Sequence, residues 1–186
     1  FAPLWQRYTP PLMAELYILR GEISKAEEQL SQGEEIEVEM NVLFTYFYLR
    51  MKSRLALEHK HYDEALTLVQ EMLSMIHTSG TLYFLEDLYF YGQVLRAMGR
   101  DDESYQAMIT ARDKAKEQGS KWTLWRILVA ISEIEHQRGN TEEADRRLTE
   151  ARNNLAYIAD HISDPELRST FLEQPEVRMV NETLKQ

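Results

Sequence analysis

The side chains best able to do chemistry in this sequence are its histidines, carboxylates and arginines, because it contains no cysteine. His59 and His61 stand two residues apart, which on a helix points them about 200° away from each other. One helix therefore cannot bring both imidazoles onto one metal ion. The pair also falls where a turn between helices is expected, so a solvated turn is the other interpretation. We predict no metal site, and the other three histidines stand singly.

The densest group of carboxylates lies near the start of the sequence and comprises Glu27, Glu28, Glu34, Glu35, Glu37 and Glu39. Such a group can dock a basic partner or a divalent ion, or it can simply be a solvated helix end and loop. A calcium loop needs alternating oxygen ligands and a glycine at its turn, and the segment lacks that order. The solvated loop is the interpretation that we favour.

Catalytic motifs are absent from the sequence. Gly92, Gly99 and Gly119 are isolated, and no Gly-Lys-Ser/Thr follows a glycine-rich turn, so there is no phosphate-binding loop. There is also no nucleophile elbow and no His-Glu-x-x-His zinc motif. We therefore predict no enzyme activity, no catalytic residue and no cofactor.

Composition narrows the range of partners. The net charge is −10, from 31 acidic and 21 basic residues, and a surface of that sign repels phosphate backbones. No apolar run approaches the ~20 residues of a membrane-spanning helix. The absence of cysteine favours a reducing compartment, so we expect a cytoplasmic protein that binds neither nucleic acid nor membrane. The sequence starts at Phe1 without a leader, and we expect it to be a piece of a longer protein.

An internal repeat organises the chain. Four segments share a turn residue, a few polar residues and then a small residue, namely Gly21–Ala26, Lys60–Ala65, Gly99–Ser104 and Gly139–Ala144. The small residues recur at spacings of 39, 39 and 40 residues. Lys60 and Ser104 are the two departures from the pattern.

Further positions follow the same register. Twelve residues upstream of each small residue stands another small one: Ala14, Ser53, Gly92 and Ser132. Large apolar residues, and once a proline, flank both sets at a distance of one helical turn: Pro10, Leu49, Leu88 and Leu128 before the first set, and Leu30, Val69, Met108 and Leu148 after the second. Small residues where two helices cross, with large ones a turn away, are typical of antiparallel helix pairs.

This pattern resembles the tetratricopeptide repeat family, whose signature places a small residue in the middle of the first helix and an alanine early in the second. The resemblance covers residues 5–160 and implies an all-α fold, a right-handed α-solenoid of about four helical hairpins. The period of 39–40 residues is longer than the family's 34, and is similar to that of bacterial regulators such as the maltose-regulon transcriptional activator and related large ATPases. The segments Asp164–Leu172 and Pro175–Arg178 resemble the end of such arrays.

The register predicts the helices and their division. First helices are expected near residues 10–20, 41–58, 81–97 and 121–138, and second helices near 22–32, 61–77, 101–118 and 141–161. Asp101 and Thr141 are the expected N-caps of two second helices. We predict one domain, with four hairpins in residues 1–162 and a C-terminal capping segment in residues 163–186, where Leu167, Phe171, Leu172 and Val177 cover the last hairpin.

In the tetratricopeptide fold the first helices line a concave groove, and the resemblance implies which residues face it: Arg50, Arg54, Tyr89, Gln93, Arg96, Arg126, Glu133 and His136. Because arginine binds carboxylates bidentately, four inward arginines favour an acidic peptide or a free C-terminal carboxylate as ligand. The alternative is that these arginines pair with Glu58, Glu86 or Glu133 of neighbouring helices.

The sequence thus predicts a protein–protein interaction scaffold within a bacterial signalling or regulatory protein. A small-molecule sensor is the alternative, and it would need an enclosed pocket near Tyr89, Phe90 and Trp125. Self-association through exposed apolar ends of the array also remains open.

Overall fold

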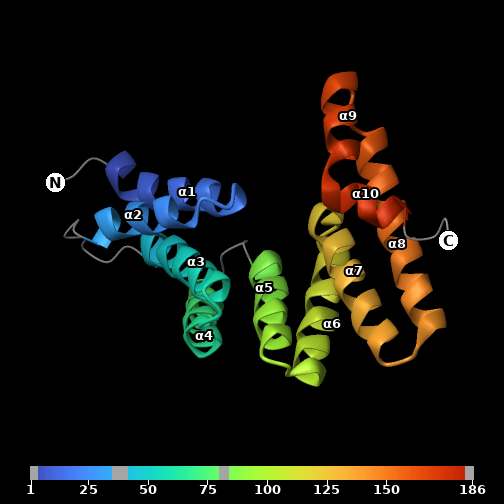
Figure 1. The fold of residues 1–186 in the computed structure, drawn as a ribbon, viewed down its shortest axis with the longest axis horizontal. Coiled ribbons are helices and arrows are strands. Elements are labelled where there is room, and N and C mark those ends of the chain that lie inside the picture. The colour runs from blue at the N-terminus through green and yellow to red at the C-terminus, as the bar shows by residue number, and fades with distance from the viewer. Residues whose placement is uncertain (1–3, 35–41, 80–83, 183–186) are drawn as a thin grey trace. The chain divides into compact units, whose positions relative to one another are not determined.

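The computed structural model describes residues 4–34, 42–79 and 84–182, and every regular element in those ranges is an α-helix (Figure 1). The helices are α1 Leu4–Leu19, α2 Ile23–Glu34, α3 Val42–Glu58, α4 Tyr62–Ser79, α5 Phe84–Ala97, α6 Asp101–Glu117, α7 Lys121–Gln137, α8 Thr141–Asp160, α9 Pro165–Glu173 and α10 Pro175–Glu182. The eight expected repeat helices are all present, and most boundaries agree within about three residues. No helix in the described ranges is long and apolar enough to cross a membrane.

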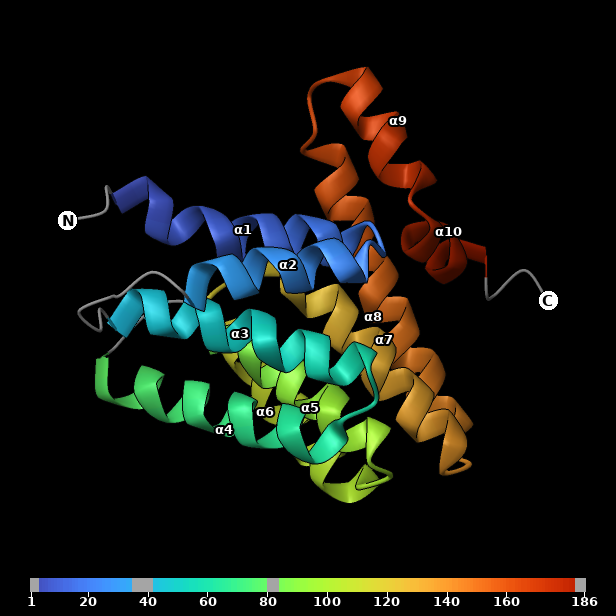
Figure 2. The same ribbon diagram turned by 60° about the vertical axis from the view of Figure 1, so that its left-hand side comes forward.

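The chain divides into two compact units, residues 1–100 and 101–186. In the first unit α1 packs against α2 and α3 against α4, and both pairs are visible in Figure 2; α3 also contacts α1 and α2, while α5 packs on α4. In the second unit α7 pairs with α8, α6 contacts α7, and α10 contacts α8 and α9. The third predicted hairpin, α5 with α6, crosses the boundary between the units, so its pairing stays a prediction.

The phased small and large residues form the core of the hairpins. Ala14, Ala26, Ser53, Ala65, Ser104, Ser132 and Ala144 are all buried, as are the large residues one turn away. In the fourth hairpin the Ser132 hydroxyl donates a hydrogen bond to the Ala144 carbonyl at 2.8 Å, across from α7 to α8. Only small side chains let two helix backbones approach that closely, so the register predicted from the sequence is confirmed at these positions.

The turn between the paired helices is the same in each repeat. In the fourth hairpin, the Gly139 N–H donates to the His136 carbonyl and the Asn140 N–H to the Glu135 carbonyl, at 3.0 and 2.9 Å. This bond pattern requires a left-handed residue after the helix, and Gly139 has φ 79°. In the second hairpin Lys60 takes that position, with φ 61°. A residue in the left-handed conformation, glycine in three repeats and Lys60 in the second, therefore terminates the first helix of each pair.

Three local predictions were wrong. The helix α1 begins at Leu4 rather than near residue 10, and runs through Pro10 and Pro11. The Tyr8 ring packs edge-on against two rings of α3, with centroids 6.3 and 6.5 Å apart, which holds these early turns in place. Asp101 and Thr141 are the first residues of α6 and α8 rather than their N-caps.

The C-terminal segment folds as two short helices against the last hairpin. Asp164 caps α9 by accepting hydrogen bonds from the Glu166 and Leu167 N–H groups, and Pro165 follows as the first helical residue. Phe171 packs against the Trp122 ring of α7, with centroids 5.9 Å apart.

The capping role holds for only part of the predicted set. Phe171 and Val177 are buried, but Leu167 and Leu172 are exposed, so their assignment to the cap was wrong. In the nine-residue helix α9, Phe171 is the buried side chain. Val180 of α10, which was not predicted, completes the buried set, and its carbonyl accepts a hydrogen bond from Arg152 Nε at 2.7 Å.

Candidate functional site: a polar cluster between α3 and α5

Three residues of α3 meet three residues of α5 in the first unit. Tyr46, Arg50 and Arg54 are spaced by four residues, so they project from one face of α3. They contact Asp87, Glu86 and Phe90 of α5, respectively. We call these six residues the α3–α5 cluster.

Arg50 is an interior member of this cluster, with only 5% of its surface exposed. Its guanidinium forms an ion pair with Glu86 and approaches Asp87 Oδ1 to 3.6 Å. Burial alone would lower the pKa of Arg50, but the charges of Asp87, Glu15 and Glu86 outweigh it, and the net pKa is raised. The alternative considered for the arginines therefore applies to Arg50, because its charge is already neutralised within the protein.

Asp87 is the most deeply buried acid of the cluster, at 1% exposure. The Tyr46 hydroxyl donates a hydrogen bond of 2.6 Å to Asp87 Oδ2. Burial raises the pKa of Asp87 to about 6, although the Tyr46 hydrogen bond and the Arg50 charge both oppose the rise. Burial and the nearby carboxylate also raise the pKa of Tyr46, so its hydroxyl stays protonated and acts as a donor.

Arg54 is the arginine of the cluster without an ion pair to any described residue. It is partly buried, its Nε atom has no hydrogen-bond partner, and no described carboxylate lies within ion-pair distance. Its guanidinium lies 5.5 Å from the centroid of the Phe90 ring, which supports it by a cation–π contact. Burial, and then the neighbouring Arg50 charge, lower the pKa of Arg54 below its ordinary value. The charges of Glu15, Glu86 and Asp87 oppose this lowering of the pKa only in part. Arg54 is therefore the cation of the cluster that remains able to form a direct ion pair with an incoming anion.

The other predicted groove residues are divided between the units. Tyr89, Gln93 and Arg96 are on α5, where Gln93 is exposed and the other two are partly buried. Arg126, Glu133 and His136 are on α7 of the second unit, where Glu133 and His136 are exposed. A groove shared by all eight residues stays a prediction.

Arg126 has a different environment from that of Arg54. Its guanidinium lies 5.0 Å from the Trp122 ring and 4.7 Å from the Trp125 ring, and it approaches Glu176 of α10 to 3.7 Å. The position of Trp122, four residues earlier on the same helix, could have indicated this stacking from the sequence. The Glu176 contact could not, because it depends on how α10 folds back.

The histidine pair and the acidic group form no metal site in the described part of the protein. His59 Nε2 lies 2.7 Å from Glu27 Oε1, and His61 lies 3.6 Å from Glu64, at the turn between α3 and α4. No group of three or more potential metal ligands occurs among the described residues. The second half of the predicted acidic group, from Glu35 onward, lies outside the described residues.

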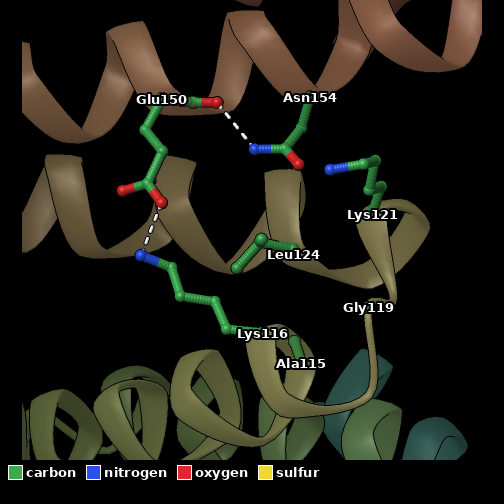
Figure 3. A pocket seen from close by; sticks show the side chains of 7 residues that line it. All are labelled: Ala115, Lys116, Gly119, Lys121, Leu124, Glu150 and Asn154. Carbon is green, nitrogen blue, oxygen red and sulfur yellow. Dashed lines mark hydrogen bonds and ion pairs between the residues drawn. The ribbon is translucent and has the colours of Figure 1, made fainter.

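A separate pocket of about 260 Å³ lies in the second unit (Figure 3). Its polar side chains already have partners. Lys116 forms an ion pair with Glu150, and the Asn154 amide donates to the backbone carbonyl of Glu150 at 2.8 Å. Lys121 lies over the Tyr157 ring at 4.5 Å. The pocket is smaller than most small-molecule sites, and none of the aromatic residues proposed for a sensor lines it.

The sequence matches no protein-family model and no curated protein. The solved structures with a similar fold include the following two. One is a signal transduction ATPase with numerous domains that carries a tetratricopeptide repeat sensor, from Pyrococcus horikoshii (19% identity, TM-score 0.66), and the other is the apo form of the quorum sensor NprR from B. thuringiensis (12% identity, TM-score 0.67). The matches cover 94% and 95% of this chain but only 30% and 51% of the other two. They confirm the predicted all-α fold class, and the fold of this chain is that of a tetratricopeptide-type helical repeat.

Proposed function

We propose that the chain is a protein-binding module that acts within a bacterial signalling or regulatory protein and holds a partner peptide on the face formed by α3 and α5. The observation that carries this proposal is Arg54, a partly buried cation without a carboxylate partner among the described residues. An unpaired charge in such a place costs free energy, which a bound anion recovers. The partner should therefore present a carboxylate, from Asp, Glu or the C-terminus of a polypeptide.

The surroundings of Arg54 fit that ligand. The Phe90 ring on one side limits the directions in which the guanidinium can turn, so its planar donors are held ready for a carboxylate. The neighbouring Arg50 is already paired with Glu86 and Asp87, so it does not compete with Arg54 for the ligand's carboxylate. Both similar solved structures belong to longer signalling or sensor proteins, which is consistent with a module that reports binding to other domains.

A small carboxylate-bearing molecule is the second candidate ligand, because the two similar structures are described as sensors. The rings that would stack on such a molecule are largely occupied. Phe90 and Trp125 are both buried, and each has an arginine over its ring. An extended peptide, which can span several helices, fits the face better than a molecule that needs an enclosed pocket.

A peptide display screen would test the proposal, followed by affinity measurements on the best binder by fluorescence anisotropy. Arg54→Gln should weaken binding by about 10- to 150-fold, since a charge-assisted hydrogen bond is worth about 1.5–3 kcal/mol. Arg20→Gln is the matched control, because Arg20 is exposed and pairs with Glu22, and it should leave the affinity unchanged.

Two results would refute the proposal. One is full affinity in a folded Arg54→Gln protein. The other is equal binding by a peptide whose carboxylates have been replaced by amides. If small carboxylates compete at the same concentration as the peptide, the sensor alternative is the correct one.

A further inference from the structure

Two large apolar side chains within α1, before its exposed last residue Leu19, are left uncovered. Leu12 and Leu16 are one helical turn apart, and their exposed fractions are 49% and 53%. Residues four apart share a face of a helix, so the two leucines form one apolar strip. Leucines that contribute to a core are normally buried.

The internal repeat shows how the equivalent positions of the other repeats are packed. At the repeat spacing, Leu12 corresponds to Met51, Phe90 and Ala130, and Leu16 corresponds to Leu55, Val94 and Ile134. All six equivalents are buried, with exposed fractions of 7% or less. The first repeat is therefore the exception at both positions.

The surface that covers these equivalents is also defined. Met51 and Leu55 of α3 share a core cluster with Ala14, Ala26 and Leu30 of the preceding hairpin. In the same way, Phe90 and Val94 of α5 share a cluster with Ala65 and Val69 of the hairpin before α5. Within the first unit, the equivalent strips on α3 and α5 thus each pack on the hairpin that precedes them in the sequence.

From this regularity we propose that Leu12 and Leu16 dock a further helical hairpin of the same repeat, placed before α1 in the polypeptide and in the same register. The docking surface of that hairpin has an alanine early in its second helix and a leucine or valine four residues later, as Ala26 and Leu30 provide for Met51 and Leu55. Its first helix contributes a small residue at its centre, as Ala14 does.

A second copy of this chain is a poorer occupant. The hairpin surfaces that could receive the strip are already used within each copy, since Met51 and Leu55 cover the first and Phe90 and Val94 cover the second. The last hairpin is covered by α10, whose Val177 is buried. Each copy also carries a net charge of −10, so two copies repel each other.

The test adds one hairpin to the full chain. A duplicate of residues 3–41 is fused directly before residue 3, which places the new hairpin one repeat period upstream. The inner copies of Leu12 and Leu16 then meet the duplicated Ala14, Ala26 and Leu30. We expect the fused protein to melt at least about 4 °C above the parent, because the inner leucines become buried.

The substitution pair Leu12→Gln and Leu16→Gln then separates the possible outcomes. In the inner copy it should remove the gain in melting temperature, whereas in the outer copy of the same fused protein, and in the parent, it should change little. Leu19→Gln in the inner copy is a further control, since Leu19 is exposed and corresponds to the exposed Glu58 and Ala97.

Three results would overturn the proposal. The first is a fused protein without any gain in melting temperature, and the second is an equal effect of the substitutions in the inner and outer copies. The third is a parent that sediments as a dimer and becomes monomeric when Leu12 and Leu16 are replaced, because the strip would then bind a second copy.

Discussion

The turn after α3 offers a direct test of the repeat, because Lys60 stands there where the other repeats have glycine. Its φ of 61° lies close to the values of 71–79° at Gly21, Gly99 and Gly139. The Lys60 N–H donates to the Leu57 carbonyl at 2.9 Å, as the bond pattern of the turn requires. Lys60→Gly keeps this bond and relieves the left-handed strain.

The magnitude follows from two opposing effects. A left-handed conformation costs a residue with a Cβ atom about 1–2 kcal/mol. Glycine loses more backbone entropy on folding, which offsets about 0.5–1 kcal/mol of the stabilisation gained by relieving that strain. The Lys60 side chain is exposed, and among the described residues it has no hydrogen bond, ion pair or ring contact that the substitution would remove. The net stabilisation should therefore be about 0.5–1 kcal/mol, or a few degrees in melting temperature for a protein of this size.

Urea and thermal unfolding of Lys60→Gly and of the reciprocal Gly139→Lys would measure both signs. Beyond its chain neighbours, no atom lies within 4 Å of a Cβ atom placed on Gly139, so the reciprocal change tests the backbone conformation alone and should cost about 1 kcal/mol. If Gly139→Lys unfolds like the parent, the left-handed turn is not what terminates the helix, and the explanation of the repeated glycine fails. A less stable Lys60→Gly would show instead that the lysine side chain stabilises the turn.

Two other predictions concern the core and the charge cluster. Ala65→Leu and Ala144→Leu should each lower the free energy of unfolding by about 1–3 kcal/mol, because both alanines are buried between paired helices. Ala97→Leu is the control, since Ala97 is exposed and the substitution should leave the stability unchanged. Equal melting temperatures of all three variants would contradict the register. Burial raises the pKa of Asp87 to about 6 from its ordinary value of 3.8, so the folded protein binds this proton more tightly than the unfolded chain does. Protonated Asp87 therefore stabilises the fold at low pH, and this stabilisation is lost as the pH rises from 3.8 to about 6. Asp87→Asn should therefore remove that part of the pH dependence in urea titrations from pH 4 to 7, and an unchanged difference between pH 4 and pH 7 would contradict the raised pKa.

Most of the fold could be predicted from the sequence because the close crossing of two helices restricts side-chain size. Ala26, Ala65 and Ala144 are buried where the helices of each pair meet, and few other residue types fit there. The turn residues add a second constraint, since a positive φ favours glycine. Two independent constraints that recur at one period locate the helices more reliably than helix propensity does.

The helix starts and the C-terminal cap were less predictable, because no recurring constraint determines them. Asn140 precedes α8 without a side-chain capping bond, and its amide donates to Glu135 instead, at 2.8 Å. Residues 163–182 occur once rather than in every repeat, so no register distinguishes the buried Phe171 from the exposed Leu172.

The candidate site shows the same limit for charged residues. Arg50 and Arg54 are one turn apart on α3, and the repeat register treats both as inward-facing positions. Their difference comes from α5, where Glu86 and Asp87 reach Arg50, while Phe90, one turn further along, reaches Arg54. A carboxylate at one level of the neighbouring helix and an aromatic ring at the next make one arginine an internal ion-pair partner and leave the other without an ion pair among the described residues. Which arginine can bind a ligand is therefore decided by the neighbouring helix, and a register along one helix cannot contain that information.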